Sequence, residues 1–395
     1  MTALVELERA GSTSALERCT GDAQGFLART WGRRAVVHHG AEPDGFADLL
    51  TFDDVDRLLS TTSLRAPAFR LVKAGEQIPE SGYTRSGTTG SRPVSGMADP
   101  RRVFERFREG ATIVLQGLHR YHEPVARFAR DLELELGHPC QVNAYVTPPG
   151  AQGLPLHDDP HDVFALQAFG RKSWEVHAAP AEPHRGPLLA VVEGGDAIYM
   201  PEGTPHAATT QETLSGHLTI GVHVASWRDV VSRAVRDALA GDASLDGALP
   251  AGWHRDPAAM AAELERRLAA ASSALEALDV DDVADGEAMR FLSARPSLLR
   301  GALVETMELD AIGDETVIER REGAICEVRV RDGRLIVLLG DRRLEMPSWL
   351  EPAMRRIAEA PLFRVRDLAG EVADAPSRVV LVRRLVREGL LRPAG

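Results

Sequence analysis

The chain has 395 residues, of which 44% are hydrophobic and 26% are charged, so we expect a folded protein with more than one domain. Its formal net charge of -12 argues against nucleic-acid binding, because phosphate contacts need clustered Lys and Arg. The three cysteines are isolated and lack C-x-x-C spacing, which argues against a disulfide framework or a zinc knuckle. Because there is no signal-peptide pattern and no apolar run of about 18 residues, we expect a cytoplasmic protein that does not span a membrane.

The first 78 residues are predicted to form short helices that serve as a scaffold. Residues 22–31 and 51–61 each place an Asp or Thr before an apolar-periodic run, as at a helix N-cap. Residues 80–100 are rich in Gly, Ser, Thr and Pro and lack periodicity, which indicates a long loop. Loops of this length often act as lids over a binding site.

The middle of the chain is dominated by predicted strands. Residues 111–117 and 140–150 alternate as strands do, and a helix is expected between them over 121–136. Further strands, divided by Gly and Pro, continue to residue 224. Several short strands in this order indicate a barrel or jelly roll.

The last third of the chain changes character twice. Residues 228–310 carry Ala- and Leu-rich helical patterns with an apolar stripe, which predict a helical packing domain or a homodimer interface. Residues 325–347 predict two strands joined by a turn at Asp332-Gly333, followed by three helical segments in the order of a winged helix. Nearby acids balance the arginines there, so packing is favoured over DNA binding. The predicted domains are therefore 1–227, 228–310 and 311–395.

Two separate motifs could together bind a metal ion. In "LHDD", His157 and Asp159 are two residues apart, a spacing that on a strand places both side chains on one face. Residues 194–206, "GGDAIYMPEGTPH", have the spacing G-x5-P-x-G-x2-H, which is similar to the second motif of the cupin superfamily and ends at His206. Two imidazoles and one carboxylate suit non-haem Fe(II), although a zinc hydrolase could use the same ligands.

Lys172 favours the iron alternative. It lies in "GRKSW", one strand and turn after the first two candidate ligands, where an interior charge would be unfavourable unless it were paired with an anion. The carboxylate of a co-substrate would provide that anion.

Residues 143–177, together with "GDAIYMPEGTPH" and "SGHLTIGVH", resemble the Jumonji-C-type, cupin-4 family that contains the ribosomal oxygenases. The resemblance implies an α+β chain: a double-stranded β-helix (cupin or jelly roll) with a helical N-terminal scaffold, then a helical dimerisation region and a C-terminal winged helix. It also implies a hydroxylase that uses Fe(II), 2-oxoglutarate and O2.

The resemblance assigns roles by position. His157, Asp159 and His206 match the catalytic iron ligands, and Lys172 matches the residue that anchors the distal carboxylate of 2-oxoglutarate. Four further residues match the co-substrate pocket, or else pack the barrel: Asn143, Tyr145, His217 and Thr219. Three more match with an expected role in the fold: Asp162, Phe164 and Gln167. Pro160 departs from a regular strand and is expected to re-aim the metal-binding edge, and His161 is expected at the rim.

Three functions follow from these observations. The first is hydroxylation of a side chain in a ribosomal or other protein, since the acidic balance suits a basic peptide held between the barrel mouth and the 80–100 loop. The second is oxygenation of a peptide or small molecule in natural-product biosynthesis. The third is a non-enzymatic, metal-bearing regulatory module.

Overall fold

The computed structural model describes residues 14–394, except for 152–154, 185, 211 and 332. It divides the chain into two compact units, one ending at Val224 and the next beginning at Ala225, close to the predicted boundary after residue 227. The expected division at residue 310 stays a prediction. The first residues, in which we found no signal pattern, lie outside the described part. Within that part, no helix combines the length and the apolar character needed to cross a membrane.

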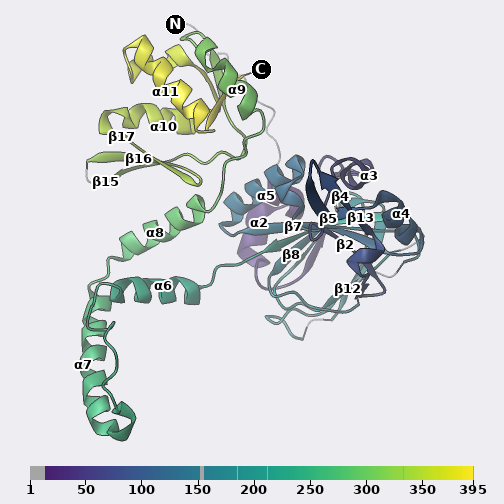
Figure 1. Cartoon of the computed structure of the whole chain (residues 1–395), viewed down its shortest axis with the longest axis horizontal. Coiled ribbons are helices and arrows are strands. Elements are labelled where there is room, and N and C mark those ends of the chain that lie inside the picture. Colours follow the sequence, from purple (N-terminus) through teal and green to yellow (C-terminus); the bar gives the residue numbers. More distant parts are fainter. Residues whose placement is uncertain (1–13, 152–154, 185, 211, 332, 395) are drawn as a thin grey trace. The chain divides into compact units, whose positions relative to one another are not determined.

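The described residues of the first unit form three β-sheets, and the two largest carry most of the candidate site residues (Figure 1). The larger has the strand order β1-β11-β8-β13-β7-β6-β2-β3 and the smaller has the order β10-β9-β12. The strands of the larger sheet are β1 (Val36–His38), β2 (Phe69–Lys73), β3 (Glu76–Gln77), β6 (Thr112–Leu115), β7 (Cys140–Thr147), β8 (Asp162–Phe169), β11 (Ala197–Met200) and β13 (Ser215–Val222). Those of the smaller sheet are β9 (Arg171–Val176), β10 (Leu188–Glu193) and β12 (His206–Thr210).

Period-two alternation along β7 and β13 separates a helix-covered face from an interior face. Val142, Ala144 and Val146 of β7 join the main hydrophobic core, as do the alternate residues of β13. Their neighbours, including Asn143 and Tyr145, line a cavity on the opposite face. The same alternation that builds the core therefore supplies polar side chains to the interior.

Helices cover the outer face of the larger sheet. They are α1 (Ala15–Thr20), α2 (Ala23–Arg29), α3 (Phe52–Thr61), α4 (Pro100–Arg108) and α5 (Glu123–Leu136), with a short 3-10 turn η2 (Leu118–Arg120) before α5. The predicted helices in 22–31, 51–61 and 121–136 are confirmed. Asp22 caps α2 and Thr51 caps α3, as the sequence indicated, and Thr51 also forms a capping box with Asp54.

The expectation that residues 1–78 are only helical is wrong. β1 pairs with β11, and β2 pairs with β6 and β3, so the N-terminal segment contributes three strands to the larger sheet. These strands are two to five residues long. Such short segments carry too few alternations to be recognised, and pairing with distant strands decides their conformation.

Residues 80–100 form a β-hairpin rather than the long loop that we expected. A 3-10 turn η1 (Glu80–Gly82) precedes β4 (Thr84–Thr89) and β5 (Arg92–Ala98), which form a separate two-stranded sheet. Gly90 has a φ of 61° at the turn. Most residues of both strands are exposed or half-buried, so the hairpin has no apolar face that would have produced a period-two pattern.

The second unit begins with the predicted helices, which are α6 (Trp227–Leu239), α7 (Pro257–Glu276), α8 (Val280–Ser293) and α9 (Ala302–Glu308), with 3-10 turns η3 (Trp253–Arg255) and η4 (Leu309–Ala311). Arg233 of α6 forms an ion pair of 2.7 Å with Glu287 of α8. None of the described residues of α6, α7 or α8 is fully buried. Their apolar side chains therefore remain partly uncovered in the single chain.

The C-terminal part of this unit has its own hydrophobic core. Its strands are β14 (Val317–Arg320), β15 (Glu327–Arg331), β16 (Arg334–Leu339), β17 (Arg342–Pro347), β18 (Leu362–Arg364) and β19 (Leu391–Pro393). Its helices are η5 (Ser348–Leu350), α10 (Glu351–Glu359), η6 (Val365–Gly370) and α11 (Ala375–Arg387). The predicted strand pair over 325–347 is confirmed by β15 and β16. β17 is a third strand, which we did not distinguish from β16 in the sequence. Asp332 itself lies outside the described residues.

Candidate functional site

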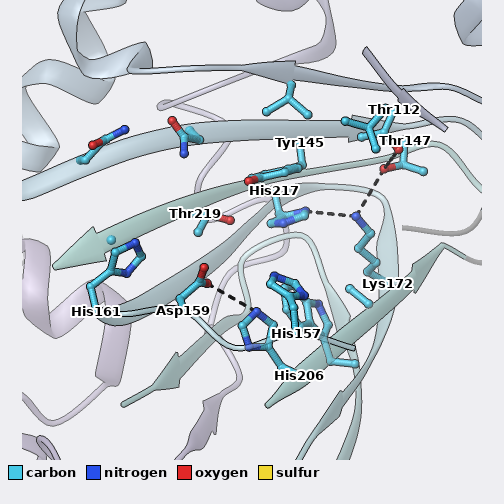
Figure 2. Close-up of a pocket in the computed structure, with 17 residues that line it drawn as sticks. Thr112, Tyr145, Thr147, His157, Asp159, His161, Lys172, His206, His217 and Thr219 are labelled. Carbon is cyan, nitrogen blue, oxygen red and sulfur yellow. Dashed lines mark hydrogen bonds and ion pairs between the residues drawn. The ribbon is translucent and has the colours of Figure 1, made fainter. Parts of the chain in front are cut away.

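All eight candidate site residues line one cavity in the first unit (Figure 2). They come from β7, β9, β12 and β13 and from the segment before β8, and they are Asn143, Tyr145, His157, Asp159, Lys172, His206, His217 and Thr219. The cavity thus collects side chains from both sheets.

His157, Asp159 and His206 form a cluster with the composition of a metal site. Their potential ligand atoms all lie within 4.8 Å of one another, and Nε2 of His206 is 3.7 Å from Oδ2 of Asp159. Figure 2 shows Asp159 and His206 facing each other, with His157 beside them. One ion could therefore contact all three side chains.

Hydrogen bonds fix which nitrogen each histidine offers. Nδ1 of His157 lies 2.8 Å from the carbonyl oxygen of Pro155, and Nδ1 of His206 lies 2.9 Å from that of Thr204. Since a carbonyl can only accept, each Nδ1 carries the proton and each Nε2 keeps a free lone pair. Burial lowers the pKa of His206, which also favours the neutral, ligating form.

The backbone joins the two segments that carry these residues. His157 and His206 exchange N–H···O bonds of 3.1 and 2.7 Å, and the amide of Gly203 donates to the carbonyl of Asp159 at 2.9 Å. This corrects the expected geometry, because His157 makes only an isolated bridge and Asp159 precedes β8. Pro160 lies between these two residues and β8, as the sequence suggested. The turn at Pro201–Gly203, and not a longer run of strand pairing, connects to the Asp159 segment.

Lys172 marks the other end of the site. Its side chain is 2% exposed, and Nζ lies 3.4 Å from Oγ1 of Thr147 and 3.3 Å from Nδ1 of His217. Burial lowers the pKa of Lys172 to about 7. Burial, and secondarily the Lys172 charge, lowers the pKa of His217 well below its usual range, so His217 is a neutral acceptor. A bound carboxylate would restore the charge on Lys172.

Asn143 and Tyr145 form the wall between these two ends. The amide of Gly117 donates to Oδ1 of Asn143 at 2.9 Å, which fixes the side-chain NH2 of Asn143 as its donor end. The Tyr145 ring stacks on His217 with centroids 5.2 Å apart and an interplanar angle of 8°. Burial raises the pKa of Tyr145, so its hydroxyl stays protonated and can donate.

Sequence reasoning missed several cavity residues. Thr147 contacts Lys172, and its hydroxyl lies 3.1 Å from that of Thr112 on β6. Trp174 and Gln141 also line the cavity. Period two could have found these residues, because Gln141 and Thr147 share a face of β7 with Asn143, and Trp174 shares a face of β9 with Lys172.

The other expected residues divide into two groups. His161 lines the same cavity and its ring packs against His223, while its expected place at the rim stays a prediction. Asp162, Phe164 and Gln167 are buried in β8 and do not line the cavity. The expected contribution of the 80–100 segment is also not found, since none of its described residues lines the cavity.

The donor set suits Fe(II) more than a closed structural metal site. Two neutral imidazoles and one carboxylate leave coordination positions for small ligands, and the cluster opens into the cavity rather than into packed core. A buried cation in the same cavity is unfavourable unless an anion binds there, as a dicarboxylate would.

In a comparison with known protein families, the JmjC domain matches residues 118–230, a range that contains the candidate site residues. The chain is 28% identical over 232 residues to ribosomal oxygenase 1 of Gallus gallus, covering 54% of this chain and 37% of that protein. It is 34% identical over 170 residues to ribosomal oxygenase 2 of Bos taurus, covering 39% and 36%. The chain therefore spans about a third of the length of these curated relatives.

Among solved structures, the chain is similar to YcfD, a ribosomal oxygenase from Escherichia coli. The TM-score is 0.56 at 18% identity, with 95% of this chain and 98% of that chain covered. A second structure of YcfD, in complex with cobalt and 2-oxoglutarate, has a TM-score of 0.53 at 18% identity and covers 94% of this chain and 98% of that one. At this identity the likeness shows a common JmjC/cupin fold of mixed helices and sheets.

Proposed function

We propose, from the premise that residues 118–230 form a JmjC domain, that the chain is an Fe(II)- and 2-oxoglutarate-dependent oxygenase that hydroxylates a protein side chain. One observation carries the proposal: the cluster of His157, Asp159 and His206 shares a cavity with the buried Lys172. A metal alone would not require that cation, and a simple anion site would not require the three ligands.

In this proposal, Nε2 of His157, Nε2 of His206 and the carboxylate of Asp159 hold the iron. The bound iron supplies O2 activation, in which 2-oxoglutarate is oxidised to succinate and CO2 while one oxygen atom enters a C–H bond of the substrate. Lys172 and Thr147 hold the distal carboxylate, and His217 accepts a hydrogen bond from Lys172. Asn143, Tyr145 and Thr219 orient what binds between the two ends.

A protein substrate, with ribosomal proteins as the first class to test, is favoured over a free metabolite. The curated relatives include ribosomal oxygenases and proteins named bifunctional lysine-specific demethylase and histidyl-hydroxylase, such as that of Drosophila grimshawi. The net charge of -12 would attract a basic peptide. Because 80–100 is a hairpin that does not line the cavity, the peptide groove is assigned to the barrel mouth alone.

The second unit is proposed to make a homodimer through residues 228–310 and to end in a winged helix at 311–395. Leu264 and Leu268 of α7 are 47% and 60% exposed, and Val280 of α8 is 75% exposed. Such side chains on amphipathic helices would be covered by a second copy. The fold likeness to YcfD extends over this part of the chain and supports the same division.

The direct test is turnover of 2-oxoglutarate. The purified chain should convert 2-oxoglutarate to succinate slowly without substrate and only when Fe(II) is present. Asp159→Ala should stop this conversion. A zinc hydrolase would leave 2-oxoglutarate unchanged whichever metal is supplied.

A further inference from the structure

A buried carboxylate outside the cavity joins the two segments that carry the candidate metal ligands. Asp162 is 4% exposed and opens β8, shortly after Asp159. Its Oδ1 accepts a 2.8 Å hydrogen bond from the amide of Glu202, in the turn that leads to His206. Its Oδ2 accepts a hydrogen bond from the hydroxyl of Tyr199. The side chain at the start of β8, close along the chain to Asp159, is therefore hydrogen-bonded to the 199–202 stretch that leads to His206.

Tyr199 extends this connection to the N-terminal scaffold. It lies in β11, is 1% exposed, and its hydroxyl accepts a 2.8 Å hydrogen bond from the amide of Gly32. Its ring packs edge-on against Phe26 at 4.8 Å and stacks on Trp31 at 5.6 Å. Burial and the nearby Asp162 carboxylate raise the pKa of Tyr199, so the hydroxyl remains a donor.

These contacts are difficult to rearrange. When a buried carboxylate loses a hydrogen-bond donor, much of the free energy of its desolvation is left uncompensated. Both hydrogen bonds of Asp162 are therefore strongly favoured. The aromatic packing fixes where the Tyr199 hydroxyl can lie. The distance between the segment at Asp159 and the turn before His206 is therefore set from outside the cavity, in addition to the backbone bonds between them.

We infer that Asp162 and Tyr199 are positioning residues of the metal site, which hold the Asp159 segment and the His206 turn at the separation that one metal ion needs. This inference rests on the proposed function, because it requires that the cluster bind a metal. The side-chain hydrogen bonds and ring contacts of Asp162 and Tyr199 are made with residues other than the candidate metal ligands. Their role would resemble that of outer-shell partners, which commonly tune metal affinity.

The test uses Tyr199→Phe with Tyr121→Phe as a matched control. Both variants lose one tyrosine hydroxyl, but the Tyr121 hydroxyl donates to the carbonyl of Ala68 at 3.0 Å, away from the ligand segments. The full-length apo-protein is titrated with Co(II), and the visible absorption of the bound ion reports both affinity and coordination geometry.

We expect Tyr199→Phe to weaken Co(II) binding by roughly 10-fold or more and to change the shape of the Co(II) spectrum. Tyr121→Phe should reproduce the wild-type affinity and spectrum, whatever its melting temperature. Asp162→Asn should weaken binding at least as much, and adding Tyr199→Phe to it should cost little more, because the two residues share one hydrogen bond.

Each other outcome has a distinct meaning. Wild-type affinity and spectrum in a folded Tyr199→Phe would overturn the inference while leaving the proposed function intact. Equal weakening in Tyr121→Phe would also overturn it, because the effect would then be a general loss of stability. Failure of both Tyr199→Phe and Asp162→Asn to fold, beside a folded control, would assign the pair to the fold alone. A wild-type chain that does not bind Co(II) would refute the proposed function itself.

Discussion

Nζ of Lys172 lies 3.3 Å from Nδ1 of His217, and both side chains are buried within the same cavity. Burial lowers the pKa of both groups, to about 7 for Lys172, so the pair cannot be doubly charged near neutral pH. In the free protein, Lys172 is therefore only partly protonated near neutral pH, and its ammonium form is available to bind an anion. A dicarboxylate bound at this end would stabilise the charged form of Lys172 and raise its pKa again.

Co-substrate binding should therefore take up a proton. Above about pH 7, the free protein has lost the Lys172 proton and the complex has regained it, so affinity for 2-oxoglutarate should fall as pH rises. Calorimetry near pH 8, in two buffers of different ionisation enthalpy, measures the uptake directly. Lys172→Met should show none. A wild-type protein with no uptake and a flat affinity between about pH 6 and 9 would contradict the assignment.

Removing the Lys172 ammonium should weaken co-substrate binding strongly. Lys172→Ala is expected to cost about 2–5 kcal/mol in 2-oxoglutarate affinity, as for a charge left unpaired at a buried site. Thr147→Val should cost less, about 0.5–1.5 kcal/mol, because it removes one neutral hydrogen-bonding group. Co(II) affinity serves as the control and should be unchanged in both. Unaltered 2-oxoglutarate affinity in Lys172→Ala would move the anchor elsewhere.

The metal cluster predicts one Fe(II) per chain. Asp159→Ala should lose most of the iron, since two imidazoles remain and the only carboxylate of the cluster is gone. His161→Ala is the matched control, because its imidazole lines the same cavity but lies outside the cluster. Iron analysis after desalting distinguishes them. Iron retained in Asp159→Ala but lost in His161→Ala would require a different ligand set.

The exposed leucines of α7 predict that the chain is a homodimer. Light scattering at micromolar concentration should give twice the chain mass, and Leu264→Glu with Leu268→Glu should give the single-chain mass, since charges would enter the interface. Val380→Glu tests whether an added charge alone matters, because Val380 is 66% exposed on α11 outside the proposed interface. A monomeric wild type would refute the dimer without affecting the metal site.

Sequence periodicity predicted the elements whose two faces differ. The strands β7 and β13 alternate between core and cavity, and α3 begins after the N-cap Thr51 that its sequence indicated. Where the two faces of an element do not differ, periodicity did not predict the element. The β4–β5 hairpin is largely exposed on both strands, so its residues resembled a loop. The short strands β1 and β2 depend on distant partners that local patterns do not contain.

The candidate site shows the same division. His157, Asp159, His206 and Lys172 were found because their residue types and spacing are unusual. Thr147 was missed, although it lies two residues after Tyr145 on the same face of β7, because a threonine in a strand suggests ordinary β-propensity. The contact of Asp162 with Tyr199 could not be predicted from spacing, since the two residues come from different strands and meet only through the fold.

The most direct test of the proposed function is hydroxylation of a protein. The chain, loaded with Fe(II) and supplied with 2-oxoglutarate and O2, is offered peptides from basic ribosomal proteins beside free amino acids and small peptide natural products, with the Asp159→Ala variant as the blank. Mass spectrometry should find a gain of one oxygen atom on a single side chain of a ribosomal peptide, accompanied by succinate and absent from the blank. Oxygenation of a free amino acid or small natural product, with every long peptide left unmodified, would contradict the proposal and make biosynthetic oxygenation the better account.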